Sequence, residues 1–204
     1  MSQPSTVLVP PTRLPRWVEN FRARHGDVDL AVDDGTFGGT AADGSTFLAR
    51  LPFAGSYDGP PEAASFADAC DPMELWGVLL VRKGGFAVAR VAGGAILESK
   101  VGQRHVKGRT KAGGQSQQRF ARRRDNQARV AYEAAAEHAA RILAGVPVLV
   151  TGGDHAAVEA VLSDRRLGGL SVVPPFLAVP DPRRSVLEQA VVDAGSVRVE
   201  VMNA

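Results

Sequence analysis

Residues 111–124, KAGGQSQQRFARRR, place two adjacent glycines directly before a glutamine-rich turn and a dense run of positive charge. The pair Gly113-Gly114 can adopt backbone angles closed to other residues and adds no side-chain bulk. Such a stretch suits a loop tip that enters a narrow and strongly anionic place. The plainer alternative is a solvated turn before a solvated helix.

Positive charge is concentrated around this stretch. Residues 100–129 contain ten basic residues and one acidic residue, whereas the rest of the chain contains 14 basic and 21 acidic residues. The formal net charge of the whole chain is only +2. A nearly neutral chain with one strongly basic segment is expected to meet a polyanion at one place.

Composition restricts the class of protein. With 204 residues and 45% hydrophobic content, the chain has room for one domain with a small accessory module. The single cysteine, Cys70, excludes an internal disulfide framework and a cysteine zinc site. The sequence shows no signal peptide, no apolar run of about 18 residues, no histidines at metal-ligand spacing and no GxxxxGK[ST] motif. A cytoplasmic protein without membrane span, metal or cofactor is expected.

The hydrophobic pattern from residue 74 onwards predicts alternating strands and helices. Strands are expected over 76–81, 86–91, 95–99, 148–151, 170–173 and 197–201, and helices over 116–143, 154–162 and 183–194. Short Gly-containing turns join the first three strands into an antiparallel meander. The order β-β-β-α-β-α-β-α-β predicts an α/β fold, a mixed sheet covered by helices, with parallel crossovers in its second half.

The first 73 residues predict a small N-terminal α+β extension. Residues 1–12 are Pro-rich and expected to be loosely ordered. Residues 14–25 predict an amphipathic helix, and residues 28–51 predict two or three short strands with tight turns. We therefore expect an extension over residues 1–73 and a second domain over residues 74–204.

The segment GGQSQQRFARRR, residues 113–124, resembles the catalytic loop and following helix of archaeal and eukaryotic class I peptide-chain release factors. Their pattern is GGQS, two variable residues, then RFAR. The longer run GQRHVKGRTKAGGQSQQRFARRRDNQ, residues 102–127, resembles more closely the actinobacterial VLRF-type (Vms-like release factor) peptidyl-tRNA hydrolases, which are linked to ribosome rescue and quality control. The resemblance covers about residues 75–204 and implies the RNase H-like fold of the release-factor middle domain.

The resemblance implies hydrolysis of peptidyl-tRNA at the peptidyl transferase centre of the large ribosomal subunit. Gly113 and Gly114 would shape the tip, and Gln115 would place the water or stabilise the transition state. Ser116 would cap the following helix. The run Gly114-Gln115-Ser116-Gln117 also fits the GxxQ pattern of related eukaryotic quality-control factors, so Gln117 is a second candidate, although the RFAR spacing favours Gln115.

Nine cationic residues are expected to hold RNA phosphates of the ribosomal RNA and peptidyl-tRNA. They are Arg104, His105, Lys107, Arg109, Lys111, Arg119, Arg122, Arg123 and Arg124. The chain has no room for a separate stop-codon-reading domain, so a monomer that releases peptides without codon recognition is expected. The segment over about residues 106–115 is expected to be mobile away from the ribosome, because few apolar groups anchor it.

Two other functions are compatible with the same residues. One is cleavage of the tRNA near its 3′ end, and the other is a non-catalytic module that binds RNA or the ribosome. The turn Gly152-Gly153-Asp154-His155 could take a phosphate at a helix N-terminus, but Asp154 is more simply an N-cap.

Overall fold

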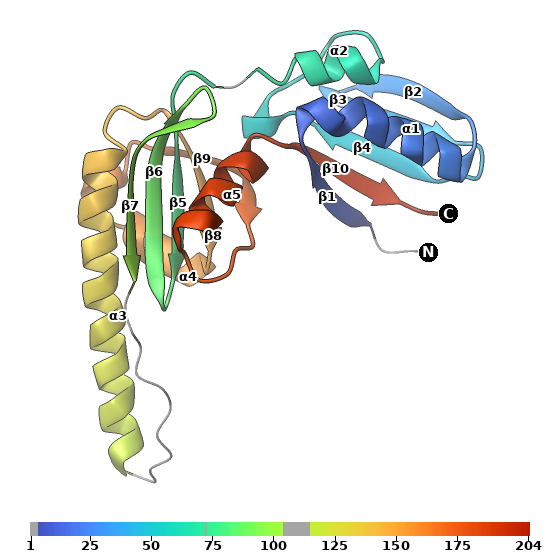
Figure 1. Ribbon diagram of the computed structural model, residues 1–204. Helices are drawn as coiled ribbons and strands as arrows, with labels where there is room; N and C mark the ends of the chain where they lie inside the picture. The colour runs from blue at the N-terminus through green and yellow to red at the C-terminus, as the bar shows by residue number, and fades with distance from the viewer. Residues whose placement is uncertain (1–3, 72, 104–114) are drawn as a thin grey trace. The chain divides into compact units, whose positions relative to one another are not determined.

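The computed structural model describes residues 4–71, 73–103 and 115–204, with the side chains of residues 103–128 outside the description. The described residues form two five-stranded sheets and five α-helices (Figure 1). The expected α/β class is therefore confirmed. No helix in these ranges is long and apolar enough to cross a bilayer.

The chain divides into two compact units, and the first contains residues 1–73 together with residues 191–204. Its sheet is antiparallel, with the strand order β1-β10-β4-β3-β2. The strands are β1 (Ser5–Val9), β2 (Val28–Asp33), β3 (Thr36–Ala41), β4 (Thr46–Arg50) and β10 (Val197–Met202), and the helices are α1 (Leu14–His25) and α2 (Ala63–Asp68).

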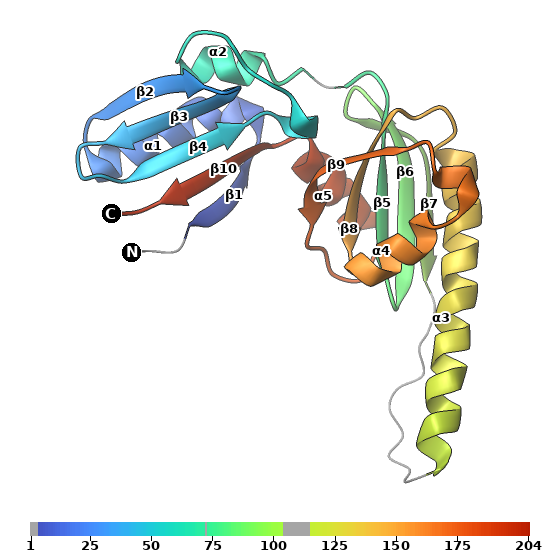
Figure 2. The same ribbon diagram turned by 180° about the vertical axis from the view of Figure 1, so that it is seen from behind.

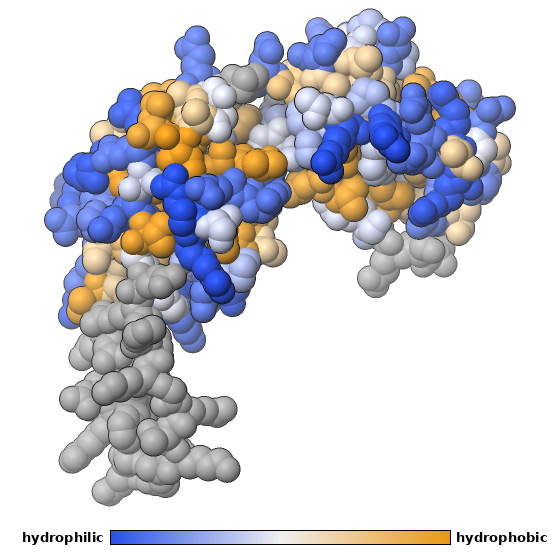
Figure 3. All heavy atoms as spheres, viewed as in Figure 1, coloured by the Kyte–Doolittle hydropathy of each residue, from blue (hydrophilic) through white to orange (hydrophobic). Residues whose placement is uncertain are grey.

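An aromatic cluster forms the core of the first unit. Helix α1, which forms over the predicted residues, buries Leu14, Val18 and Phe21 at helical spacing. The ring of Phe47 lies edge-on to the ring of Phe21, with 5.2 Å between centroids. The opposite, solvent-facing side of α1 is mainly hydrophilic (Figure 3). Gly39 makes room for this packing, because a Cβ atom there would lie 2.5 Å from Cε1 of Phe47.

The second unit, residues 74–190, contains a mixed sheet with the order β7-β6-β5-β8-β9. Strands β5, β6 and β7 form the predicted antiparallel meander, and β8 and β9 continue the sheet in parallel to β5 (Figure 2). The strands are β5 (Trp76–Arg82), β6 (Gly85–Ala92), β7 (Ala95–Gln103), β8 (Val148–Gly153) and β9 (Ser171–Leu177), and the helices are α3 (Gln115–Ile142), α4 (His155–Leu162) and α5 (Arg184–Ala194). Three short 3₁₀ helices lie at Pro11–Arg13, Pro52–Ala54 and Arg165–Leu167.

Strand β5 is the centre of this unit and is buried from Trp76 to Val81. Helices α3 and α4 pack together on one face of the sheet, while α5 lies on the other face (Figures 1 and 2). A strand covered on both faces must be apolar throughout, which explains the unbroken hydrophobic run WGVLLV. The turn between β6 and β7 uses Gly93 and Gly94 at φ values of 54° and 83°, where glycine costs least.

Two terminal segments differ from the sequence prediction. Residues 5–9, expected to be loosely ordered, form β1, which pairs with β10. Strand β10 forms over the predicted residues, but it lies between β1 and β4 in the first sheet instead of extending the second. Its burial alternates, because Val197 and Val199 face the first unit's core while Arg198 is half-exposed. Such alternation is typical of an antiparallel strand with one open face.

Strand β9 is also longer than predicted. The strand predicted over residues 170–173 begins at Ser171 and continues through the pair Pro174-Pro175 to Leu177. The sheet order places β9 at an edge, where a proline without an N–H group is tolerated.

Replacing Phe47 with alanine is expected to lower the free energy of unfolding of the first unit by about 3–5 kcal/mol, because a large buried ring is removed from the aromatic cluster. The neighbouring Leu48, 44% exposed on the opposite face, supplies the control. Leu48→Ala should cost less than about 1 kcal/mol. Urea unfolding followed by circular dichroism and tryptophan fluorescence measures both, and equal losses would contradict the proposed core.

Candidate functional site

The predicted site residues fall on two parts of the chain. Seven of them lie outside the described residues: Arg104, His105, Lys107, Arg109, Lys111, Gly113 and Gly114. Nearly all of the segment expected to be mobile, about residues 106–115, also lies outside the described residues. The other six occupy the first three turns of α3, where the backbone is helical and the side chains are outside the description: Gln115, Gln117, Arg119, Arg122, Arg123 and Arg124.

The fold fixes where this segment begins and ends. Strand β7 ends at Gln103 on the edge of the second sheet, and α3 begins at Gln115. Helix α3 has 28 residues, which corresponds to a length of about 42 Å. Its ribbon continues past the end of the sheet toward its N-terminus (Figure 1). The long helix that the sequence predicted over residues 116–143 is therefore present, shifted by one residue.

The C-terminal half of α3 anchors the helix to the sheet. Ala135, Ala136, Ala139 and Ile142 are buried in the core of the second unit, together with Leu79 and Val88 of the sheet. Alanine adds little bulk and has the highest helix propensity, so the helix axis can lie close to the strands without loss of helicity. These apolar contacts anchor this half of the helix without a charged side chain on the face toward the sheet.

A stack of three residues links the end of β7 to α3. The ring of Phe86 on β6 stacks on the ring of His138 on α3, with centroids 5.7 Å apart and planes inclined by 25°. On β7, Gly102 lies against the same ring, because a Cβ atom at Gly102 would be 2.3 Å from Cε1 of Phe86. Any residue larger than glycine at position 102 would therefore require the buried ring of Phe86 to move.

Exposed polar contacts join the same elements. Arg141 of α3 forms an ion pair with Glu98 of β7. Arg184 of α5 donates to the hydroxyl of Ser99 at 2.9 Å, again on β7. Exposed ion pairs contribute about 1 kcal/mol or less. These contacts orient β7 relative to its neighbours more than they stabilise the unit.

The described residues contain neither a cluster of metal-ligating side chains nor a reactive thiol. No group of three or more His, Cys, Asp or Glu side chains among them could hold a metal ion. Burial, together with the nearby charge of Asp71, raises the pKa of the Cys70 thiol to about 11. This thiol, which donates to the carbonyl oxygen of Phe66, is protonated at neutral pH and is a poor nucleophile.

The turn between β8 and α4 has the simpler of its two expected roles. Asp154 is the N-cap of α4, and its Oδ1 accepts from the backbone N–H groups of Ala156 and Ala157 at 3.1 and 3.4 Å. These are the amides that a bound phosphate would need. The adjacent His155 stacks on Phe176, with 3.6 Å between ring centroids.

Comparison with known protein families decides the family of this chain. The sequence profile described as "Actinobacteria/chloroflexi VLRF1 release factor" matches residues 74–200. The chain belongs to this VLRF1 release-factor family. The resemblance seen in residues 102–127 is thereby confirmed at the level of the family, and a role in release or rescue at the ribosome follows from it. A search of curated protein sequences gave no match.

Three solved structures are similar to this VLRF1 chain at low sequence identity. "Vms1 mitochondrial localization core" has a TM-score of 0.43 and 15% identity, over 91% of this chain and 81% of that chain. A structure described as "Archaeal protein" has a TM-score of 0.37 and 16% identity, over 76% and 50%. Archaeoglobus fulgidus Pelota has a TM-score of 0.28 and 13% identity, over 93% and 62%. None of the three is close enough to assign a role to a residue of this chain.

Replacing Gly102 with alanine is expected to lower the free energy of unfolding by about 1–3 kcal/mol, because the added methyl group overpacks the Phe86 ring. Gly169 is the matched control, since a Cβ atom there would have no neighbour within 4 Å. Gly169→Ala should change the free energy by less than about 0.5 kcal/mol. Thermal and urea unfolding measure both variants, and an unaffected Gly102→Ala variant would show that this contact is loose.

Proposed function

We propose that this VLRF1 protein hydrolyses peptidyl-tRNA on the large ribosomal subunit without recognising a stop codon, and so frees stalled ribosomes. The observation that carries the proposal is the motif Gly113-Gly114-Gln115 in a chain of a release-factor family. In the sequence this motif follows edge strand β7, and its glutamine is the first residue of the long helix α3. We assign this activity to the part of the chain from residue 74 onwards, acting as a monomer in the cytoplasm without a cofactor.

The reaction is the addition of water to an ester. Water attacks the carbonyl carbon that joins the nascent peptide to the tRNA ribose. The bond from this carbon to the ribose oxygen then breaks, the ribose oxygen takes a proton, and the peptide leaves with a free carboxyl group. A glutamine amide does not accept a proton at neutral pH, so Gln115 acts by hydrogen bonding. It orients the water or stabilises the developing oxyanion.

Ribosomal RNA and tRNA supply the surroundings of this reaction in our proposal. The nine cationic residues around the motif neutralise RNA phosphates and hold Gln115 in place. Gly113 and Gly114 keep the tip narrow, and the anchored half of α3 fixes the base of the segment. Because positioning alone lowers a reaction barrier by several kcal/mol, a protein with few catalytic groups can still act as a hydrolase.

Replacing Gln115 with alanine is expected to reduce peptide release about 100- to 1,000-fold, the usual effect of removing one group that stabilises a transition state. The assay uses purified large subunits that carry labelled peptidyl-tRNA. Peptide, full-length tRNA and shortened tRNA are separated on a gel. Gln117→Ala is the matched control, and it should retain most of the activity.

The products of this assay distinguish the competing functions. Release of peptide with full-length tRNA supports ester hydrolysis, and loss confined to Gln117→Ala would move the catalytic role to Gln117. Shortened tRNA would replace the proposal with strand cleavage near the 3′ end. Binding by the wild type without any cleavage would leave only a non-catalytic module.

Binding to large subunits is expected to weaken steeply with salt, because each protein–phosphate contact releases counterions. In a plot of log affinity against log salt concentration, Arg122→Gln should reduce the slope by about one. Arg16 on the solvent side of α1 supplies the control, and Arg16→Gln should leave the slope unchanged. A nearly flat salt dependence of the wild type would show that the basic segment is not the RNA contact.

A further inference from the structure

A pocket of about 520 Å³ lies on the second unit where α3 meets α4. The turn after β5 contributes Lys83, helix α3 contributes four residues from Arg129 to Ala136, and Ala160 to Asp164 close the far side. Sites for small ligands typically measure about 300–1,000 Å³. The pocket is outside the Gly-Gly-Gln segment, and no step of the proposed hydrolysis uses it.

Part of the pocket lining is apolar and aromatic. Buried Ala136, exposed Ala160 and the half-buried Tyr132 contribute to it. Tyr132 packs against the core of the second unit, so its ring is held in place. Burial and the negative charge of Asp154 raise the pKa of Tyr132, which keeps the phenol neutral at physiological pH. A fixed, neutral aromatic ring beside two small side chains is suited to a flat ligand.

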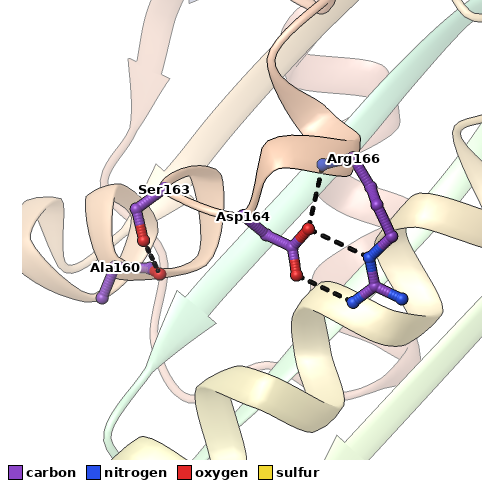
Figure 4. A network of polar contacts seen from close by, with 4 residues as sticks. All are labelled: Ala160, Ser163, Asp164 and Arg166. Atoms are coloured by element: carbon purple, nitrogen blue, oxygen red, sulfur yellow. Dashed lines mark hydrogen bonds and ion pairs between the residues drawn. The ribbon is translucent and has the colours of Figure 1, made fainter.

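The acidic side chains around the pocket already have partners. Asp164 accepts from Arg166 through both carboxylate oxygens, at 3.0 Å from Nε and 2.7 Å from the terminal nitrogen (Figure 4). Glu133 forms an ion pair with Arg129 one helical turn earlier. Asp164 remains ionised, since its hydrogen bonds with Arg166 lower its pKa to about 2. Its charge is therefore balanced by Arg166 and not by a ligand.

One cation of the pocket lining has no partner. Lys83 is exposed and has no hydrogen-bond or ion-pair partner among the described residues. Ser163 donates its hydroxyl hydrogen to the carbonyl oxygen of Ala160 at 2.8 Å, so its oxygen can still accept a hydrogen bond. The pocket thus presents an aromatic ring beside two small apolar side chains, one hydrogen-bond acceptor and one unpaired cation.

We infer that this pocket receives a single unpaired nucleotide of RNA, with its base against Tyr132 and its phosphate beside Lys83. Bases bind to proteins by stacking on aromatic rings and by phosphate contacts to cations. The inference shares its RNA partner with the proposed function, but it requires no hydrolysis.

The position of the pocket on α3 favours RNA over a partner protein. Arg129 at the pocket belongs to α3, and the same helix carries four arginines at positions 119–124 of the sequence. The pocket and the arginine-rich segment are therefore parts of one helix. An RNA strand that binds along this helix would meet both.

Ultraviolet cross-linking of the full-length wild-type protein to large subunits tests the contact directly. The chain has two tyrosines, and Tyr57 is buried in the first unit, so it is an internal control. We expect a nucleotide remnant on the peptide that contains Tyr132 and none on the peptide that contains Tyr57. A link from Tyr132 to a ribosomal protein, or no link at Tyr132, would overturn the inference.

Substitutions separate stacking from other effects of the side chain. Tyr132→Phe keeps the ring and should bind large subunits within about twofold of the wild type, whereas Tyr132→Leu should bind about tenfold more weakly. Lys83→Gln should bind several-fold more weakly, while Arg16→Gln on the other unit should not. Unfolding midpoints are measured for each variant, and Lys83→Gln, on an exposed turn, is the variant that does not disturb the core. Equal losses for Tyr132→Phe and Tyr132→Leu would contradict stacking.

Two further measurements assign the source of the nucleotide and separate this inference from the hydrolase proposal. Adenosine monophosphate alone should bind the protein only weakly. The RNA assignment would be overturned if the free nucleotide bound tightly and the affinity for large subunits did not depend on Tyr132. In the release assay, Tyr132→Leu should recover activity at saturating protein concentration, but Gln115→Ala should not. Failure of the hydrolase proposal would abolish wild-type release and leave the binding differences intact.

Discussion

The close packing of the alanine face of α3 on the sheet is the contact on which the second unit depends. Ala135 and Ala139 are fully buried, and Ile142 closes the same face toward the end of the helix. A charged residue could not occupy these positions without a large desolvation cost. Four of the six arginines of α3 lie at positions 119–124, and the other two, Arg129 and Arg141, have exposed side chains, so the buried positions of the last turns are left for packing. One continuous helix thereby joins a hydrophobic core to a strongly cationic segment.

This division has a consequence for the proposed chemistry. A hydrogen-bonding glutamine is useful only if it is held in position, because its contribution is orientation and not proton transfer. The Gly-Gly-Gln segment is attached to two elements that are fixed to each other through Phe86, which contacts both Gly102 and His138. Fixing both ends reduces the conformational freedom that docking in an RNA site must remove. The protein then contributes placement, and the RNA contributes the remaining groups.

How much the sequence predicts depends on whether the information is local. Helix α3 and the meander β5–β7 follow from hydrophobic period and glycine turns, and their predicted positions agree with the structure, except that β7 continues past its predicted end at residue 99 to Gln103. The pairing of β1 with β10 joins the two ends of the chain, and no local pattern specifies such a partner. The pocket is equally non-local, since Lys83, Tyr132 and Asp164 come from separate elements. The motif at residues 113–115, by contrast, can be identified from the sequence, because the identification depends on family resemblance and not on geometry.

The placement of β10 makes the two units unequal. The second unit is contiguous in sequence, over residues 74–190, and contains every strand of its own sheet. The first sheet lacks an inner strand until residues 197–202 insert between β1 and β4, where Val197 and Val199 complete the core around Phe47. Without β10, strand β1 would lose its pairing partner and the core around Phe47 would lose two buried valines. The first unit therefore takes part of its sheet and core from a segment that follows the second unit in the sequence.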